Sequence, residues 1–301
     1  MPQDLVVVGQ VKRVVVVVLD GLRPDAITHF GMQHTLRLAR NGASTFAGRT
    51  VAPSVTAAAM GSLLTGASPA RHGLECDRFQ IPRPRGTVHP LPRVLADAGL
   101  PSTMFIGHVP FLMRPLATRI ARHLGFQDAR CRGRSAIEVL ASAREALSQQ
   151  RDGVIIMHWG DADRAGHDHG WMSGRYGEAA TVLDAALGLL MKLLDLSDPG
   201  TVLVALADHG GGGRQRRHHD SDHPSDRTIP IIFAGGGVRP ATLREGVTLL
   251  DVPATILALL GLPQPDSYGG TSLIGLTPRH SPRARGAAVS PTPDASLLPA
   301  A

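Results

Sequence analysis

The sequence predicts an α/β protein whose central, mostly parallel β-sheet is covered by helices on both faces. Two observations lead to this prediction. Short apolar runs alternate with segments of helical periodicity, as in βαβ units. The runs are also unbroken and rich in β-branched residues, as expected for strands buried on both faces. The expected strands are 14–19, 102–107, 153–158, 201–207 and 229–234, and the expected helices are 33–41, 57–65, 90–98, 135–149, 176–196 and 251–260.

The size and composition of the chain favour one large domain. The chain has 301 residues, of which 43% are hydrophobic, which is ample for a core. We expect a single catalytic domain over residues 1–276. Residues 277–301 are Pro, Arg, Ala and Ser without periodicity, so we expect a disordered tail there.

The charge and the cysteines narrow the function class. The net charge is +6, but the arginines are scattered rather than gathered in one stripe, so we expect a small anionic substrate and no nucleic acid. Two cysteines, Cys76 and Cys131, provide no disulfide framework and no CxxC metal site. No apolar run reaches the length of a membrane span, and the N-terminus does not resemble a signal peptide. We therefore predict a cytoplasmic protein, with the oligomeric state left open.

Three of the expected strands end in aspartate or histidine. The first runs into Asp20-Gly21, the third feeds "GDADRAGH" and the fourth ends on Asp208-His209-Gly210. A single Asp-Gly pair is typical of a turn. Three such endings would place these groups along one edge of the sheet, where open α/β sheets bind their ligands. The repetition predicts a metal centre at that edge.

Aspartate and imidazole are the ligands expected for zinc, manganese or iron. Asp163 and His167 are four residues apart, and Gly166 would let the chain fold both onto one ion. The alternative is an i,i+4 pair on the surface of a helix, but the glycine and the position just after a strand argue against a regular helix. Asp208 and His209 could hold one ion from consecutive positions, because the glycines at 210–213 permit a turn.

Two further segments offer candidate residues. "RRHHDSDHPSDRTIP" contains His218, His219 and His223, any of which could be a third imidazole ligand or a surface residue. Thr56 stands where the helical pattern 57–65 opens. It is either an N-cap that satisfies free N–H groups or a nucleophile whose alkoxide the helix N-terminus and a divalent metal stabilise.

Six motifs occur in an order that resembles one family. "LDGLRPD", "APSVTAAAMGSLLTGASPARHGL", "DADRAGH", "ADHG", "HDSDHPSDRTIPIIFAGGGV" and "DVPATILALLGLPQP…GGTSL" span about residues 13 to 275. Together they resemble the alkaline phosphatase superfamily, in particular its type I phosphodiesterase/nucleotide pyrophosphatase branch. The resemblance implies a three-layer sandwich with a central sheet, and a hydrolase of phosphodiester or pyrophosphate bonds that uses two divalent metals, most often zinc.

The same resemblance assigns roles to individual residues. One ion would be held by Asp20, Thr56, Asp208 and His209, and the other by Asp163, His167 and His219. His219 is chosen by counting back from Pro230, with His223 as the second choice. Thr56 would attack phosphorus and form a phosphothreonine intermediate. No substrate-binding residue is assigned.

One departure from the family pattern concerns the substrate. Relatives that cleave nucleotides carry an asparagine three residues after the nucleophile, where this chain has Ala59. The missing donor could be replaced by the N–H of Ala57, by an arginine, or by nothing. The alternatives on the same fold are a phosphomonoesterase, a phosphonate hydrolase, a cofactor-independent phosphoglycerate mutase, a sulfatase-like hydrolase and an inactive metal-binding relative. Neither cysteine lies in a sulfatase motif, and the nucleophile position is threonine.

Overall fold

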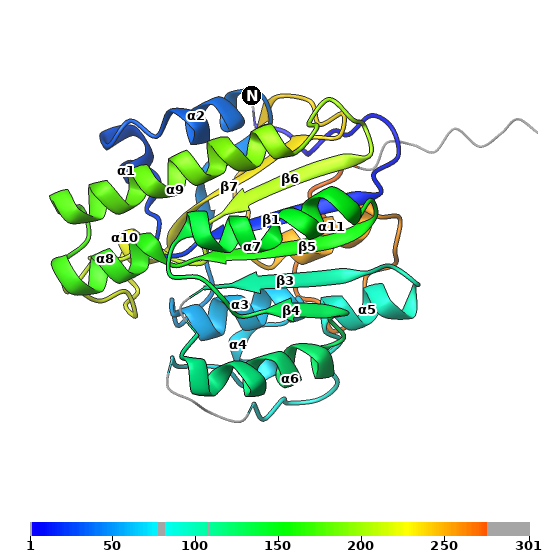
Figure 1. The fold of residues 1–301 in the computed structure, drawn as a ribbon, viewed down its shortest axis with the longest axis horizontal. Coiled ribbons are helices and arrows are strands. Elements are labelled where there is room, and N and C mark those ends of the chain that lie inside the picture. The colour runs from blue at the N-terminus through cyan, green and yellow to red at the C-terminus, as the bar shows by residue number, and fades with distance from the viewer. Residues whose placement is uncertain (1, 78–81, 108, 276–301) are drawn as a thin grey trace, which may run out of the picture.

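An eight-stranded β-sheet forms the centre of the computed structural model, which describes residues 2–77, 82–107 and 109–275 (Figure 1). The tail that the sequence predicts to be disordered lies outside the described residues. The strands are β1 Arg13–Leu19, β2 Ala43–Arg49, β3 Ser102–Ile106, β4 Asp128–Arg130, β5 Gly153–Trp159, β6 Thr201–Leu206, β7 Thr228–Gly235 and β8 Ala241–Thr242.

The strand order across the sheet is β4-β3-β5-β1-β6-β7-β2-β8. The strands from β4 to β6 are parallel to one another, whereas β7 is antiparallel to both of its neighbours. The sheet is therefore mixed and mostly parallel, which confirms the predicted fold class. The strand β1 lies between β5 and β6, and the residues of all three are buried on both faces.

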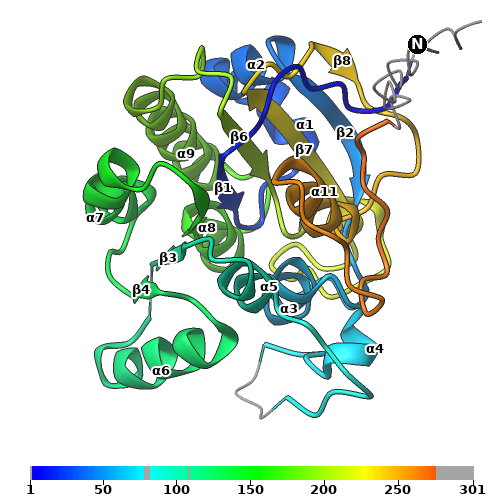
Figure 2. The same ribbon diagram turned by 90° about the vertical axis from the view of Figure 1, so that its right-hand side faces the viewer.

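Helices cover both faces of this sheet (Figure 2). Helices α1, α2, α7 and α9 lie on one face, and α3, α5 and α11 lie on the other. The helices are α1 Pro24–His29, α2 Gln33–Arg40, α3 Thr56–Thr65, α4 Pro69–His72, α5 Leu91–Asp97, α6 Arg114–Leu124, α7 Ala136–Gln149, α8 Asp161–His169, α9 Gly174–Leu193, α10 Pro224–Arg227 and α11 Asp251–Leu259, with a 3₁₀ turn η1 at Phe111–Met113.

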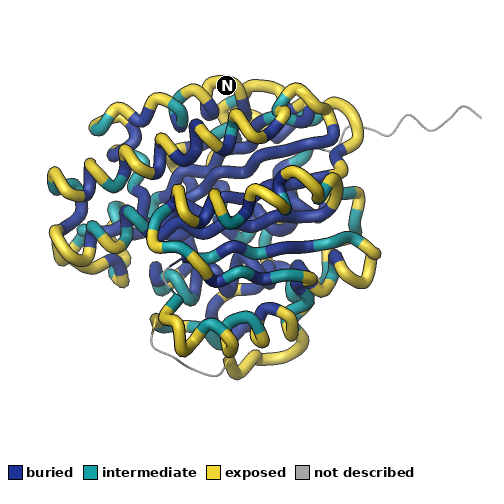
Figure 3. Tube along the Cα trace, viewed as in Figure 1, coloured by how far each residue is buried: buried dark blue, intermediate teal, exposed yellow. Residues whose placement is uncertain are grey.

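The apolar core follows the central strands, which are buried throughout, while the outer sides of the helices are exposed (Figure 3). Val14 to Val18 of β1 have no exposed surface. Because a parallel strand in this position meets helices on both sides, its residues need no polar alternation. No helix in the described parts of the chain has both the length and the apolar character needed to cross a bilayer.

The structure contains all five predicted strands and all six predicted helices. The elements not predicted from the sequence are β2, β4, β8, α1, α4, α6, α8, α10 and η1. The strand β4 has only three residues, and β2 is interrupted by a register shift between Thr45 and Gly48. Short or irregular strands carry little periodicity, so neither strand stands out in the sequence.

The prediction that residues 163–167 avoid a regular helix is wrong. They lie inside α8, with Asp163 and His167 one turn apart on the same side. Gly166 does not form a turn. It allows α8 to pack closely against the Trp171 ring, because a Cβ at this position would lie 2.5 Å from that ring. The i,i+4 pair is thus helical and also faces the candidate site.

Candidate metal centre

The strand order brings the three polar strand endings together. Because β5, β1 and β6 are adjacent and parallel, their carboxyl ends meet at one edge of the sheet. Asp20 follows β1 directly, Asp208 follows β6 by two residues, and Asp163 lies in the first turn of α8 after β5. The Asp163 N–H donates to the Asp20 carbonyl at 3.0 Å, which ties α8 to the end of β1.

The first group of side chains, here called the inner cluster, consists of Asp20, Asp208 and His209, all of them buried. His209 Nε2 lies 3.4 Å from Asp20 Oδ1 and 3.7 Å from Asp208 Oδ2. Asp208 Oδ1 accepts N–H groups from Gly21 at 3.2 Å and from His209 at 3.0 Å. The other oxygen of Asp208 is therefore the one directed to the cluster, and it has no hydrogen-bond donor among the described residues.

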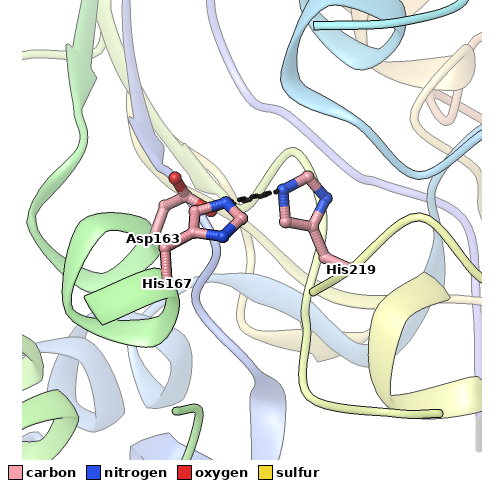
Figure 4. Close-up of side chains that lie close together, drawn as sticks. All are labelled: Asp163, His167 and His219. Atoms are coloured by element: carbon pink, nitrogen blue, oxygen red, sulfur yellow. Dashed lines mark hydrogen bonds and ion pairs between the residues drawn. The ribbon is translucent and has the colours of Figure 1, made fainter. Parts of the chain in front are cut away.

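The second group, here called the outer cluster, consists of Asp163, His167 and His219 (Figure 4). The Nε2 atoms of His167 and His219 lie 3.1 Å apart. Asp163 Oδ1 lies 3.5 Å from His167 Nε2 and 3.7 Å from His219 Nε2. The ring of His219 also stacks on that of His209 at a centroid distance of 3.9 Å. The two clusters therefore adjoin.

Backbone carbonyls fix the orientation of all three imidazoles. The Nδ1 atoms lie 2.8 Å from Gly210 O for His209, 2.9 Å from Arg217 O for His167 and 2.7 Å from Ser54 O for His219. A carbonyl oxygen can only accept, so each Nδ1 carries a proton and each Nε2 is the atom directed to the clusters. This arrangement is typical of metal-bound histidines.

In the outer cluster the two Nε2 atoms face each other and a carboxylate oxygen. Two unprotonated nitrogens 3.1 Å apart repel each other unless a cation or a proton lies between them. Burial and the neighbouring His209 ring lower the pKa of His219 to about 3, so this ring stays neutral at physiological pH. A metal ion fits this donor set.

The inner cluster also fits a cation. Burial, reinforced by the nearby carboxylates of Asp208 and Asp163, raises the pKa of Asp20 well above its ordinary value. Burial acts on Asp208 in the same sense, but the rings of His209 and His158 outweigh it and hold the pKa of Asp208 below its ordinary value. Buried oxygens of Asp20, Asp163 and Asp208 lack a hydrogen-bond partner among the described residues. Divalent cations would satisfy these oxygens and their charge.

Thr56 lies beside the inner cluster and is not an N-cap. It is the first residue of α3, whose N-cap position is Val55, and its Oγ1 lies 3.0 Å from His209 Nε2. The two atoms are within hydrogen-bond distance of each other. The structure thus places the Thr56 oxygen next to the candidate ligands and at the positive end of a helix dipole.

The position after Asp20 requires a glycine, which accounts for the Asp-Gly pair in the first motif. Its φ is +69°, and a Cβ would lie 2.8 Å from Asp163 Cα, so only glycine permits this approach of the β1 loop to α8. Its carbonyl accepts hydrogen bonds from Trp171 Nε1 and Tyr176 Oη, each at 2.9 Å. Two buried aromatic side chains therefore hold the loop that carries Asp20.

Of the three candidate histidines in the 218–223 loop, the structure brings His219 to the outer cluster. His219 is buried, and Ser54 holds it from both sides, accepting from Nδ1 and donating from Oγ to the His219 carbonyl. His223 is exposed and accepts the N–H of Ser225 at the start of α10. His218 is also exposed, with its ring 6.2 Å from that of His167.

His158 was missed in the sequence analysis. It lies in β5, 6% exposed, with Nε2 3.4 Å from Asp20 Oδ2 and 4.0 Å from Asp208 Oδ2. This nitrogen has no other partner among the described residues. The available signal was a histidine inside an otherwise apolar run that is expected to be a buried strand, since buried polar groups need partners.

The structure also bears on the missing asparagine. Ala59 is completely buried, so its side chain offers nothing to a substrate. The N–H of Ala57, one of the proposed replacements, donates to Asp77 Oδ1 at 2.8 Å. A carboxylate therefore accepts from the helix N–H group that a phosphoryl oxygen could use.

Two family models match the chain. The model for type I phosphodiesterase/nucleotide pyrophosphatase matches residues 14–83, and the model for the metalloenzyme superfamily matches residues 95–264. The 2,3-bisphosphoglycerate-independent phosphoglycerate mutase of Pseudomonas aeruginosa (strain UCBPP-PA14) is 32% identical over 143 residues, 47% of this chain and 27% of the relative. That of Pseudomonas fluorescens (strain Pf-5) is 33% identical over 147 residues, 48% of this chain and 28% of the relative. The match thus spans only about a quarter of the length of these curated relatives.

Solved structures share the fold at low sequence identity. Murine ectonucleotide pyrophosphatase/phosphodiesterase 5, in an inactive form in complex with AMP, has a TM-score of 0.68 at 15% identity and covers 85% of this chain and 96% of its own. A Vibrio parahaemolyticus protein in the alkaline phosphatase superfamily has a TM-score of 0.68 at 15% identity, with 90% and 71% coverage. A 2-O GAG sulfatase has a TM-score of 0.67 at 14% identity, with 88% and 73% coverage.

Proposed function

This chain belongs to the metalloenzyme superfamily, and on that premise we propose that it hydrolyses phosphoric esters with two divalent metal ions and with Thr56 as nucleophile. We further propose a phosphodiester or pyrophosphate bond as the target. The inner cluster with Thr56 would hold one ion, and the outer cluster would hold the other. Zinc suits ligands of nitrogen and oxygen, and manganese or iron would also fit.

The observation that carries this proposal is the convergence of imidazole Nε2 atoms and of carboxylate oxygens without hydrogen-bond partners beside one hydroxyl. His209 Nε2 lies within 3.7 Å of both carboxylates of its cluster and 3.0 Å from Thr56 Oγ1. A structural role would pair these polar groups with donors, because unpaired buried acceptors are costly. Their arrangement instead favours cation binding next to a nucleophile.

The proposed mechanism has two displacements at phosphorus. Thr56 Oγ1 attacks phosphorus, the bond to the leaving oxygen breaks, and a phosphothreonine forms, which water then hydrolyses to regenerate the hydroxyl. When bound, the two ions would offset the charge of the three carboxylates and stabilise both the Thr56 oxyanion and the charge on the phosphoryl oxygens. The Thr56 oxyanion is also stabilised by its position at the N-terminus of α3.

The test is hydrolysis of bis(4-nitrophenyl) phosphate by protein loaded with zinc or manganese, with 4-nitrophenyl phosphate and 4-nitrophenyl sulfate as competing substrate classes. We expect the diester to be cleaved fastest. Thr56→Ala removes the nucleophile and a proposed ligand, so the rate should fall by several orders of magnitude. Thr56→Ser keeps the hydroxyl and should retain measurable activity.

Two results would contradict this proposal. Full diester hydrolysis by Thr56→Ala would exclude the threonine as nucleophile. Fast cleavage of the sulfate with little cleavage of either phosphate would favour a sulfatase-like hydrolase. Phosphoglycerate isomerisation belongs in the same screen, because the mutases of Pseudomonas are about a third identical over half of this chain.

A further inference from the structure

The surface formed by η1 and α6 exposes more large apolar side chains than any other segment of the described residues. They are Phe111 at 77% exposure, Leu112 at 86%, Met113 at 40%, Leu116 at 38% and Ile120 at 47%. Within α6 only Ala121 is buried. Leu116 and Ile120, four residues apart, lie on one side of the helix. A helix that packs through so small a face leaves its apolar side without a partner among the described residues.

The same surface is strongly basic. Residues 98–127 contain no aspartate or glutamate. A groove of about 930 Å³ beside α6 is lined by Arg114, Arg119, Arg122, Arg130, Arg132 and apolar residues that include Phe111 and Leu112. Arg130 pairs with Asp128 and Glu145, but no acidic side chain in the described chain pairs with Arg119, Arg122 or Arg132. The surface combines exposed apolar groups with uncompensated positive charge.

This surface begins at the same edge of the sheet as the metal centre. The strand β3 lies next to β5 and parallel to it, and η1 follows the carboxyl end of β3. Helix α6 then leads back to the start of β4, at the side of the molecule opposite to α2 and α9 (Figure 1). A partner bound at η1 would therefore lie at the same edge of the sheet as the metal centre.

We propose that η1 and α6 bind the surface of a bilayer that contains anionic phospholipids. The apolar side chains would enter the boundary between headgroups and acyl chains, and the arginines would bind the headgroup phosphates. A second copy of the chain is a poorer occupant, because a symmetric contact would set the unpaired arginines of both copies against each other. This inference does not rest on the proposed hydrolysis, since binding can be measured without catalysis.

The experiment measures binding of the full chain to sucrose-loaded vesicles by sedimentation. Vesicles of phosphatidylcholine alone are compared with vesicles of phosphatidylcholine and phosphatidylglycerol. We expect at least about tenfold stronger binding to the anionic vesicles, and a decrease as salt is added, because headgroup attraction is screened. Equal binding to both vesicle types, or none to either, would overturn the proposal.

Matched variants locate the binding surface. Leu116→Ser/Ile120→Ser should weaken vesicle binding at least about tenfold. The control is Leu189→Ser/Leu193→Ser on α9, where the two leucines have the same spacing and are 45% and 43% exposed. This control should bind vesicles like the wild type. Arg119→Gln/Arg122→Gln should abolish the preference for anionic vesicles. Arg37→Gln/Arg40→Gln on α2 removes the same charge from two exposed arginines with the same spacing and should leave that preference intact.

Two further measurements separate the other occupants. If the wild type forms dimers in solution and Leu116→Ser/Ile120→Ser is monomeric, a second copy covers this surface and the proposal fails. If the same variant raises KM for a soluble aryl diester without losing vesicle binding, the surface serves the substrate instead. Unchanged soluble-substrate kinetics together with lost vesicle binding would support the proposal, whether or not the preferred ester is the one proposed above.

Discussion

The inner and outer clusters contain similar side chains but are built in different ways. The inner cluster comes from the ends of β1 and β6, and its three residues are buried. The outer cluster comes from one turn of α8 and from the 218–223 loop, and the His167 side chain is 41% exposed. In the inner cluster the sheet register sets the separation of the ligands. In the outer cluster it depends on helical spacing and on the contact of His219 with Ser54.

This difference indicates how each cluster should respond to the loss of a ligand. Water can reach His167 and take the place of a missing imidazole, but it cannot easily reach Asp20 or Asp208. Loss of a buried carboxylate also changes the charge balance, which water does not restore. The inner cluster should therefore be the less tolerant of the two.

The largest expected effect is that of Asp208→Ala compared with His167→Ala. Asp208→Ala should lower the bound metal by about one equivalent per chain and reduce diester hydrolysis by several orders of magnitude, because it removes an inner carboxylate that no solvent molecule replaces. His167→Ala should keep more metal and more activity. Metal analysis after dialysis and steady-state kinetics measure both, and equal losses in the two variants would refute the proposed difference between the clusters.

The next comparison is within the loop that completes the outer cluster. His219→Ala should weaken metal binding and activity by at least about tenfold to a hundredfold, the loss typical when a residue that only orients a metal ligand is removed. His223→Ala should leave both close to wild type, since that ring is exposed and only accepts one backbone N–H. Competition with a metal-binding dye measures the affinity. The reverse order would mean that the loop presents a different histidine when metal is bound.

A smaller effect on metal affinity is expected for substitution of His158, which contacts the carboxylates of the inner cluster. Its Nε2 is 3.4 Å from Asp20 Oδ2, so it can orient the carboxylate whose other oxygen faces His209. His158→Gln should lower metal affinity by about tenfold. His72→Gln is a matched control, because His72 is also buried but bonds Ser62 instead. Metal affinity that falls equally in both variants would indicate a general loss of stability rather than a positioning role.

The smallest effect concerns Asp77, whose carboxylate accepts the N–H of Ala57. Its charge should repel a doubly charged monoester more than a singly charged diester. Asp77→Asn should therefore raise kcat/KM for 4-nitrophenyl phosphate about threefold to tenfold relative to the diester. The change should shrink with added salt. Asp97→Asn, an exposed control on α5, should leave the ratio of the two kcat/KM values unchanged. If Asp77→Asn also leaves this ratio unchanged, Asp77 does not contribute to the choice between monoester and diester.

Several features of the site were predictable from the sequence because they depend on local patterns. The unbroken apolar runs identify β1, β5 and β6, and each run leads to its polar residues within a few positions. Parallel strands place their carboxyl ends at one edge, so the approach of Asp20, Asp163 and Asp208 follows from the fold class. The glycine after Asp20 marks the close approach to α8 that the structure shows.

The fold class and the residue types gathered at one edge of the sheet could thus be predicted from the sequence, because hydrophobic periodicity and strand endings are local properties. Which of these groups meet depends on the folded chain. It placed β1 between β5 and β6, so that His158 faces Asp20, and it brought Ser54 to His219 across 165 positions of sequence. It also supplied the carbonyls that fix the three imidazoles. Such contacts depend on strand order and loop packing, which sequence spacing does not encode.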